Sequence, residues 1–387
     1  MGHPAPGEPL DHLPDAEFRQ VVRDWVEAHY PPHLRNPRQR LHFRENKPWY
    51  MALSAQGWLA PGWPREWGGM GLSAGKQLIM IEEFERHGCA RVNDLGVIML
   101  GPLLIAHGTE EQKRFFLPRI LSGEHIWAQG YSEPNAGSDL AALRMTAELD
   151  GDEWVLNGQK TWTTLGNDAN WIFLLVRTDK TVKKQAGISF LLAPMDAPGI
   201  TVRPILNIDM HDEFCEVFFD NVRVAKDNLV GGLNQGWTMA KTVLGFERIA
   251  IGSPKLSSYA LDKLWLLARR LDLLGDEAFQ EVAARLAMEL ADLKALYETF
   301  VVRIKKGEMP GADASMLKLV QSELFQRITE VMMEVAGEEA GMLEPLSGNA
   351  ALHPAGLFIQ ARPGTIYGGS SEILRTVLAK NVLELQG

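Results

Sequence analysis

The sequence predicts an α+β protein built from three successive parts, because the spacing of its hydrophobic residues changes twice along the chain. Apolar residues recur at helical spacing near the N-terminus, at the two-residue spacing of strands in the middle, and at helical spacing again towards the C-terminus. We therefore expect an N-terminal helical domain, a central antiparallel β domain that forms a sheet or barrel, and a C-terminal helical domain. The expected ranges are residues 1–123, 124–232 and 233–387.

The N-terminal part carries clear helix signals. Phe18, Val22 and Trp25 fall on one face of a helix, and the segment Lys76–His87 repeats this spacing. Thr109 is predicted to cap a further helix, since acidic residues follow it in the first turn.

The central and C-terminal parts differ in the length of their periodic runs. Short alternating runs separated by Gly, Pro, Asn and Asp predict strands in the centre, and long amphipathic runs predict helices after it. The expected strands are 146–149, Glu153–Leu156, Trp171–Arg177, Gly187–Leu192 and Cys215–Phe219. The expected helices are Met239–Ile251, Ser258–Leu274, Ala278–Val302 and Ser315–Ala336.

Composition narrows the class of function. The formal net charge of −10, without clustered lysine and arginine, argues against a nucleic-acid partner. Cys89 and Cys215 lack metal-ligand spacing, so we expect no metal site and no structural disulfide. No apolar run approaches the roughly 18 residues of a membrane span, and the proline-rich N-terminus is unlike a signal peptide. These features predict a soluble, cytoplasmic protein.

The segment Gly130–Asp139 (Gly-Tyr-Ser-Glu-Pro-Asn-Ala-Gly-Ser-Asp) is the most informative motif. Its glycines and proline exclude a buried strand or an ordinary helix. We expect a tight loop that presents hydroxyl and backbone N–H groups to a phosphate or a polar ring, with a plain surface turn as the alternative. Glu133 and Asp139 are expected to fix the turns of the loop through local hydrogen bonds.

Two later segments suggest related chemistry. After an Asn-Gly turn, Trp162 and Thr164 share a parity in a predicted strand, so both side chains are expected on one face. That face suits a planar ring system, and a cross-strand pair that fills the sheet is the alternative. Near the C-terminus, Gly368 opens a loop in which Ser370 or Ser371 caps a helix and Glu372 occupies the first turn.

In this order, the three segments resemble the flavin- and substrate-binding motifs of the acyl-CoA dehydrogenases. The resemblance implies a helical domain, a β domain and a C-terminal four-helix bundle, with FAD as the cofactor. It also implies that the C-terminal loop closes over the substrate thioester and the flavin. The cofactor-binding residues that it assigns in these segments are Tyr131, Ser132, Gly137, Ser138, Trp162, Thr164, Ser370 and Glu372.

The catalytic base implied by the resemblance is not at its commonest position. Many family members have glutamate directly after the Ile-Tyr of the C-terminal loop, where this chain has Gly368. Glu247 is a lone acid in an apolar helical run and matches the Leu-x-x-Glu-Arg context of isovaleryl-type, long-chain and bacterial steroid or branched-chain members. An ordinary surface glutamate is the alternative. We expect Glu247 to remove the α-proton and the Gly368 N–H to bind the thioester oxygen.

The implied reaction converts an acyl-CoA into a trans-2-enoyl-CoA and passes the electrons to electron-transferring flavoprotein. Ser138 and Arg248 are expected to border the substrate, Arg248 more as an ion-pair partner than as a catalytic group. Gly368 leaves room for a bulky or branched acyl group. An acyl-CoA oxidase would use the same groups and is an alternative.

The segments that hold the ADP half of FAD in homotetrameric relatives are altered here. Arg269 keeps the basic character and Gln280 stands in for a glutamine, but acids in the segment 333–339 replace glutamine and glycine. A carboxylate near a pyrophosphate is unfavourable. We therefore expect either a homo-oligomer or an α2β2 complex with a paralogous chain, and a non-catalytic or half-site subunit is the alternative.

Overall fold

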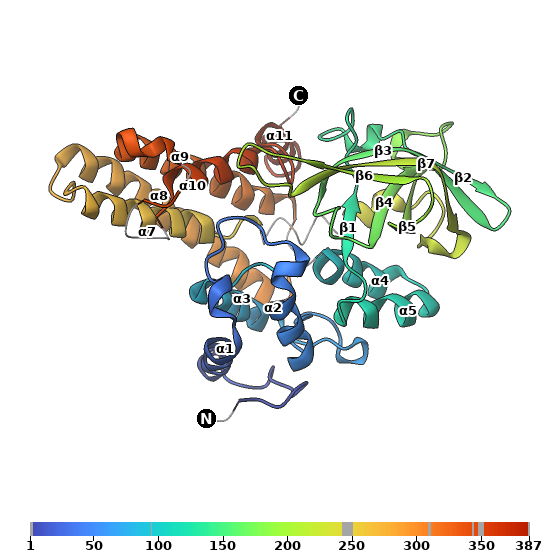
Figure 1. Cartoon of the computed structure of the whole chain (residues 1–387), viewed down its shortest axis with the longest axis horizontal. Coiled ribbons are helices and arrows are strands. Elements are labelled where there is room, and N and C mark those ends of the chain that lie inside the picture. Colours follow the sequence, from blue (N-terminus) through green and yellow to red (C-terminus); the bar gives the residue numbers. More distant parts are fainter. Residues whose placement is uncertain are drawn as a thin grey trace. The chain divides into compact units, whose positions relative to one another are not determined.

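The computed structural model describes residues 3–93, 95–241, 251–308, 311–342, 344–346 and 352–385. The chain forms two compact units, Met1–Val243 and Leu244–Gly387, which we treat separately (Figure 1). Within the described residues, none of the helices combines the length and the apolar character needed to cross a membrane. The division into three domains stays a prediction.

The first unit begins with a layer of helices. The cap predicted at Thr109 is confirmed, because its Oγ1 accepts a hydrogen bond from the N–H of Gln112 at 3.2 Å and Gln112 Oε1 accepts one from the N–H of Thr109 at 3.1 Å. The helices of this layer are α1 (Asp15–His29), α2 (Phe43–Gln56), α3 (Ala74–His87), α4 (Gly101–His107) and α5 (Glu110–Leu121).

A mixed β-sheet follows the helices. Its strands are β1 (Trp127–Gly130), β2 (Thr146–Asp150), β3 (Glu153–Thr164), β4 (Trp171–Arg177), β5 (Ile188–Pro194), β6 (Ile200–Ile205), β7 (Phe214–Ala225) and β8 (Leu229–Val230). The order is β6-β7-β3-β2-β4-β5-β8, with β1 beside β4. The prediction of a purely antiparallel sheet was wrong, because β1 and β2 both pair with β4 in parallel. The barrel alternative was also wrong: among the described residues the sheet is open, with β6 and β8 at its ends.

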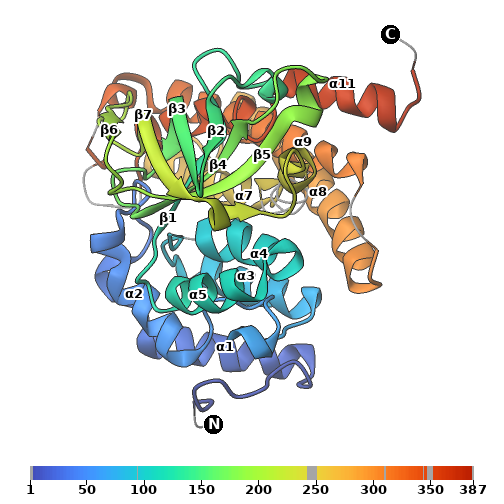
Figure 2. The same ribbon diagram turned by 90° about the vertical axis from the view of Figure 1, so that its right-hand side faces the viewer.

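Strand β4 is buried on both faces, as its continuous apolar run predicts. Phe173 and Leu175 belong to the core that also contains the N-terminal helices, and Figure 2 shows those helices gathered along one side of the sheet. Ile172 and Leu174 face the opposite side, in a second core formed by the strands themselves. The alternating side chains of one strand therefore join two hydrophobic cores.

The second unit is helical. Its helices are α7 (Lys255–Arg270), α8 (Glu277–Lys305), α9 (Ser315–Ala336), α10 (Pro354–Ala361) and α11 (Ser371–Asn381). Buried Leu264, Leu293 and Leu324 on α7, α8 and α9 share one core. Most of the predicted helix Met239–Ile251 lies outside the described residues, so the four-helix bundle stays a prediction.

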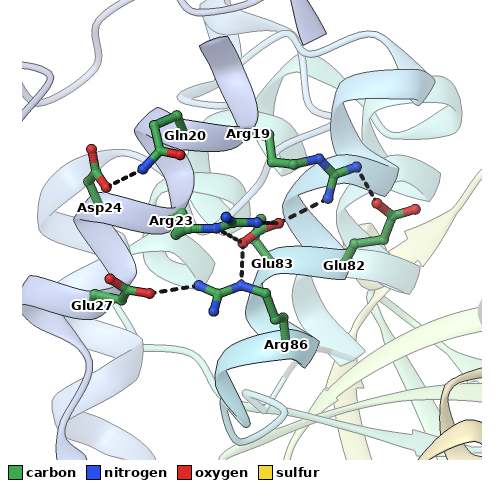
Figure 3. Close-up of polar contacts among 8 residues, drawn as sticks. All are labelled: Arg19, Gln20, Arg23, Asp24, Glu27, Glu82, Glu83 and Arg86. Carbon is green, nitrogen blue, oxygen red and sulfur yellow. Dashed lines mark hydrogen bonds and ion pairs between the residues drawn. The ribbon is translucent and has the colours of Figure 1, made fainter. Parts of the chain in front are cut away.

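Helices α1 and α3 are joined by an ion-pair cluster around Glu83, whose side chain is 1% exposed (Figure 3). Arg23 Nε donates to Glu83 Oε2 at 2.9 Å, and Arg19 Nη1 donates to Oε1 at 2.9 Å. Arg86 Nε donates to Oε2 at 2.7 Å. Burial alone would raise the pKa of Glu83, but these hydrogen bonds outweigh it and lower the pKa from 4.5 to about 2.

We predict that Glu83→Gln lowers the free energy of unfolding at pH 7 by about 2 kcal/mol, after allowance for solvent around the partly exposed guanidinium groups. The folded-state pKa lies below the unfolded one, so the contribution of Glu83 is present above pH 4.5 and is lost as the pH falls towards 2. Denaturant unfolding of both proteins across this range measures the difference. The exposed neighbour Glu82 provides the matched control, since Glu82→Gln should change the free energy by less than about 1 kcal/mol. A pH-independent difference would contradict the assignment.

Candidate functional site

The predicted ligand loop, Gly130–Asp139, leaves the end of β1 and turns sharply. The backbones of Glu133 and Ala136 exchange two hydrogen bonds of 3.0 Å, which closes the loop on itself. Gly137 and Ser138 are exposed, and nothing lies within 4 Å of a Cβ built at Gly137. The tip of the loop is therefore open to a ligand that approaches its backbone closely.

The base of this loop is buried. The Tyr131 ring packs edge-on against Phe173 and Phe190, at centroid distances of 5.8 and 6.4 Å. Tyr131 thus lies in the core rather than on the open side of the loop, and its side chain contributes to packing. Ser132 is half-buried, and its carbonyl accepts a hydrogen bond of 2.9 Å from the N–H of Thr161. This bond places the loop directly beside β3.

A fully buried lysine anchors the loop. Lys160 Nζ donates to Glu133 Oε1 at 2.9 Å, to the carbonyl of Tyr131 at 3.2 Å and to the carbonyl of Leu175 at 2.7 Å. The Glu133 carboxylate also accepts from the N–H groups of Arg144 and Met145, at 2.6 and 2.9 Å. Glu133 therefore fixes the loop to segments beyond it, whereas the sequence analysis expected only local bonds.

Burial lowers the pKa of Lys160 to about 8, although the Glu133 carboxylate acts in the opposite direction. All three protons of the ammonium group have acceptors, which is the condition for burying a charge. The sequence analysis missed Lys160. The one available signal was its place between polar strand residues just before Trp162, and that pattern is also typical of an exposed lysine.

Trp162 stands out from the end of β3. The pairing of β3 with β7 shifts register between Lys160 and Thr163, and Trp162 has a left-handed backbone with φ of 57°. Its side chain is 62% exposed, while Thr163 is buried and Thr164 is half-buried. The Trp162 ring contacts Phe214 edge-on at 6.2 Å. A large aromatic ring held in the open beside the ligand loop can stack on a planar ligand.

The second unit holds the C-terminal loop. Gly368 and Gly369 have φ of 63° and 92°, and Lys318 Nζ donates to the Gly369 carbonyl at 2.7 Å. Ser370 caps α11 as predicted, accepting a hydrogen bond from the N–H of Ile373 at 3.4 Å. Glu372 lies exposed in the first turn, where hydrogen bonds from its own backbone N–H and from Ser370 lower its pKa.

The residues expected near the ADP half of FAD lie at one end of the same unit. Arg269 is exposed at the end of α7, and exposed Gln280 donates to the carbonyl of Leu274 at 2.7 Å. The neighbouring Arg270 is held by Glu339 through two hydrogen bonds of 2.6 and 2.8 Å. The acidic segment therefore neutralises an arginine of its own chain. Glu247 and Arg248 lie outside the described residues.

We predict that Lys160→Met destabilises the first unit by about 3–5 kcal/mol, because it leaves the buried Glu133 carboxylate without a counter-ion. The double variant Lys160→Met/Glu133→Gln should recover part of this loss. Lys184→Met is the control, since it removes an exposed ion pair of 3.2 Å to Asp139 in the same loop and should cost less than about 1 kcal/mol. Denaturant unfolding measures all three. Equal effects of Lys160→Met and Lys184→Met would rule out the anchor.

Comparison with known proteins adds to this geometry. Three family models match consecutive parts of the chain: acyl-CoA dehydrogenase N-terminal domain over residues 15–124, middle domain over 128–222 and C-terminal domain over 234–383. Their order follows the change from helices to strands to helices.

The chain is similar to individual proteins over nearly its whole length. Acyl-CoA dehydrogenase IpdE1 of Mycobacterium tuberculosis is 40% identical over 382 residues, which cover 95% of this chain and 97% of that protein. The solved Tcur3481-Tcur3483 steroid ACAD has a TM-score of 0.87 at 31% identity and covers 97% of this chain and 99% of its own. The ChsE4-ChsE5 complex from Mycobacterium tuberculosis has a TM-score of 0.83 at 33% identity, with coverages of 98% and 100%. The chain belongs to the acyl-CoA dehydrogenase family and is a flavoprotein oxidoreductase of that kind.

Proposed function

We propose that this chain is an FAD-dependent acyl-CoA dehydrogenase that converts a bulky acyl-CoA into the trans-2-enoyl-CoA. The observation that carries the proposal is the open face beside the anchored loop. There the Ser132–Thr161 backbone bond sets the loop against β3, next to the exposed ring of Trp162. Family membership supports the reaction class, and electron-transferring flavoprotein is the proposed acceptor of the electrons.

The described residues of the first unit fit the flavin. The exposed Trp162 ring offers a stacking surface, and the open backbone around Gly137 can approach a pyrophosphate without steric conflict. When bound, the flavin supplies the acceptor for the hydride from the substrate β-carbon. The residues proposed to hold it are Tyr131 through its backbone, Ser132, Gly137, Ser138, Trp162 and Thr164, with Ser370 and Glu372 from the C-terminal loop.

Proton removal is assigned to Glu247. Glu247 is a lone acid in an apolar run of the sequence. Burial of a carboxylate disfavours its charged form, and a base works best when its pKa is near the working pH. The Gly368 N–H is proposed to donate to the thioester oxygen, where negative charge develops as the α-proton leaves. The left-handed backbone of Gly368 directs this N–H, and a Cβ at that position would lie 3.0 Å from Ile251 Cδ1. Ser138 and Arg248 are proposed to border the substrate.

A large acyl group is the proposed substrate class. The sequence favoured it because Gly368 lacks a side chain, but Ile251 Cδ1 lies 3.0 Å from where a Cβ would stand. The support for a bulky substrate is therefore a structural neighbour that is described as a steroid ACAD. An oxidase would use the same residues. Oxygen consumption in the absence of another electron acceptor distinguishes the two activities.

We further propose that the chain works in an α2β2 complex with a paralogous chain. The Arg270 guanidinium is already paired with Glu339 of the same chain. In homotetrameric relatives this region holds the ADP half of FAD, so this chain offers a weakened binding site for that half of the cofactor. The structural neighbour ChsE4-ChsE5 is a complex of two chains. A homo-oligomer and a non-catalytic half-site subunit are the competing assignments.

We predict that Glu247→Gln keeps the flavin and still binds acyl-CoA, yet lowers turnover by about 10²–10⁴-fold, because the amide cannot accept the α-proton. Stopped-flow bleaching of the flavin absorbance upon acyl-CoA addition measures the step directly. Glu298→Gln, at an exposed position of α8, is the matched control and should react at the normal rate. Normal bleaching by Glu247→Gln would exclude Glu247 as the base.

We also predict that the chain expressed alone binds well below one FAD per chain, because its ADP half-site is weakened. Co-expression with the paralogous chain should raise the occupancy. Flavin absorbance against protein concentration provides the measurement. Glu339→Gln frees Arg270 and removes a carboxylate, so it should raise the FAD content of the chain expressed alone towards that of a homo-oligomer. Full occupancy of the wild-type chain alone would contradict the heteromeric assignment.

A further inference from the structure

Three segments that are distant in sequence meet at His42. His42 immediately precedes α2, Asp168 follows the end of β3, and Asp212 lies in the loop between β6 and β7. His42 Nδ1 is 3.0 Å from Asp168 Oδ1, and His42 Nε2 is 2.9 Å from Asp212 Oδ1. All of these residues belong to the first unit.

A second histidine completes the group. The rings of His42 and His211 are 5.3 Å apart at their centroids, and both residues are buried. Ligand atoms of His42, His211 and Asp212 all lie within 4.8 Å of one another. Among the described residues, the His211 ring has no hydrogen-bond partner. The His211 residue is 9% exposed and its ring nitrogens are not sealed from solvent, so this imidazole beside a histidine–carboxylate pair is a donor available to a ligand.

The surrounding contacts resemble the outer shell of a metal site. The Asp168 carboxylate accepts a hydrogen bond from Nδ1–H of His42. This bond fixes the imidazole so that Nε2 points towards Asp212 and His211. Asn167 Nδ2 donates to Asp212 Oδ2 at 2.8 Å, which leaves Asp212 Oδ1 directed at His42. Metal-binding histidine and carboxylate side chains are commonly oriented by such partners.

We propose that His42, His211 and Asp212 bind one divalent transition-metal ion, with Zn²⁺ as the probe of choice. Two imidazole nitrogens and one carboxylate oxygen suit zinc and leave a fourth position for water. Bonds of about 2.0–2.2 Å require ligand atoms roughly 3.3 Å apart in a tetrahedron. The His42–Asp212 pair is already at 2.9 Å, and rotation of the His211 side chain would bring in the third ligand.

The ion would have a structural role beyond the proposed dehydrogenase reaction. It would join the β6–β7 loop to the start of α2 and, through Asp168, to the turn that follows Trp162 and Thr164. The sequence analysis expected no metal site. The proposed ligands His42 and Asp212 are 170 residues apart, so no short sequence motif indicates a metal site.

A proton is the alternative occupant of this site. Burial lowers the pKa of His42, but hydrogen bonds to Asp168 and Asp212 outweigh it and hold the pKa above its ordinary value. A protonated His42 bridging two carboxylates would hold the same loops without a metal. The two occupants differ in their need for His211, since the proton bridge does not use its ring.

The test uses the full-length chain as expressed, treated with EDTA, desalted and titrated with ZnCl₂ at pH 8. Isothermal titration calorimetry gives the affinity, and elemental analysis after desalting gives the zinc content per chain. Circular dichroism and denaturant unfolding establish that each variant is folded. The variants are His211→Gln for a ligand, Asp168→Asn for the outer shell and His107→Gln for an exposed control histidine of the same unit.

Wild type and His107→Gln should each bind one zinc ion per chain. His211→Gln should weaken binding at least about tenfold, and Asp168→Asn about 10- to 100-fold. Absence of stoichiometric zinc in the wild type would overturn the proposal and leave the proton bridge. Unchanged affinity in His211→Gln would also overturn it. Neither result depends on dehydrogenase activity, so the outcome is independent of the proposed function.

Discussion

The first unit depends on one buried ion pair, Lys160 with Glu133. Lys160 enters from β3, and its ammonium group reaches the ligand loop and the carbonyl of Leu175 on β4. The carboxylate in turn accepts two backbone N–H groups just before β2. A single charge pair thus fixes four segments around the point where the chain leaves β1. The loop can expose its glycines and hydroxyl groups at the tip because its base is held so completely.

The exposed tryptophan depends on the same region. Lys160 is buried, and the register of β3 against β7 shifts immediately after it. The shift and the left-handed backbone of Trp162 turn the indole outward, while Thr163 stays buried. A regular strand would have continued to pair with β7 through this segment. The exposed face beside the loop is therefore built from an interruption of the sheet next to the buried Lys160.

Local patterns in the sequence were enough to predict most of the helices and strands. The apolar run of β4 was predicted with the bounds that the structure has, and the cap at Thr109 followed from neighbouring residues. Contacts between distant segments were not predictable. The parallel pairing of β1 with β4 excluded the antiparallel sheet, and Lys160 and Glu133 are 27 residues apart with nothing local to connect them. The parity of Trp162 and Thr164 suggested an ordinary strand face, since no propensity reveals a register shift.

A buried lysine also fixes the C-terminal loop of the second unit. Lys318 on α9 is fully buried and donates to the carbonyl of Gly369, and burial lowers its pKa to about 8. Each unit thus places a lysine on a regular element and uses it to hold backbone carbonyls of an irregular loop. The long aliphatic stem packs in the core, and the ammonium group satisfies carbonyls that the turn leaves without partners. A loop of glycines in left-handed conformations has little packing of its own. Its shape must therefore come from such a donor on a rigid helix, which explains how Gly368 can lack a side chain and still keep a defined N–H direction.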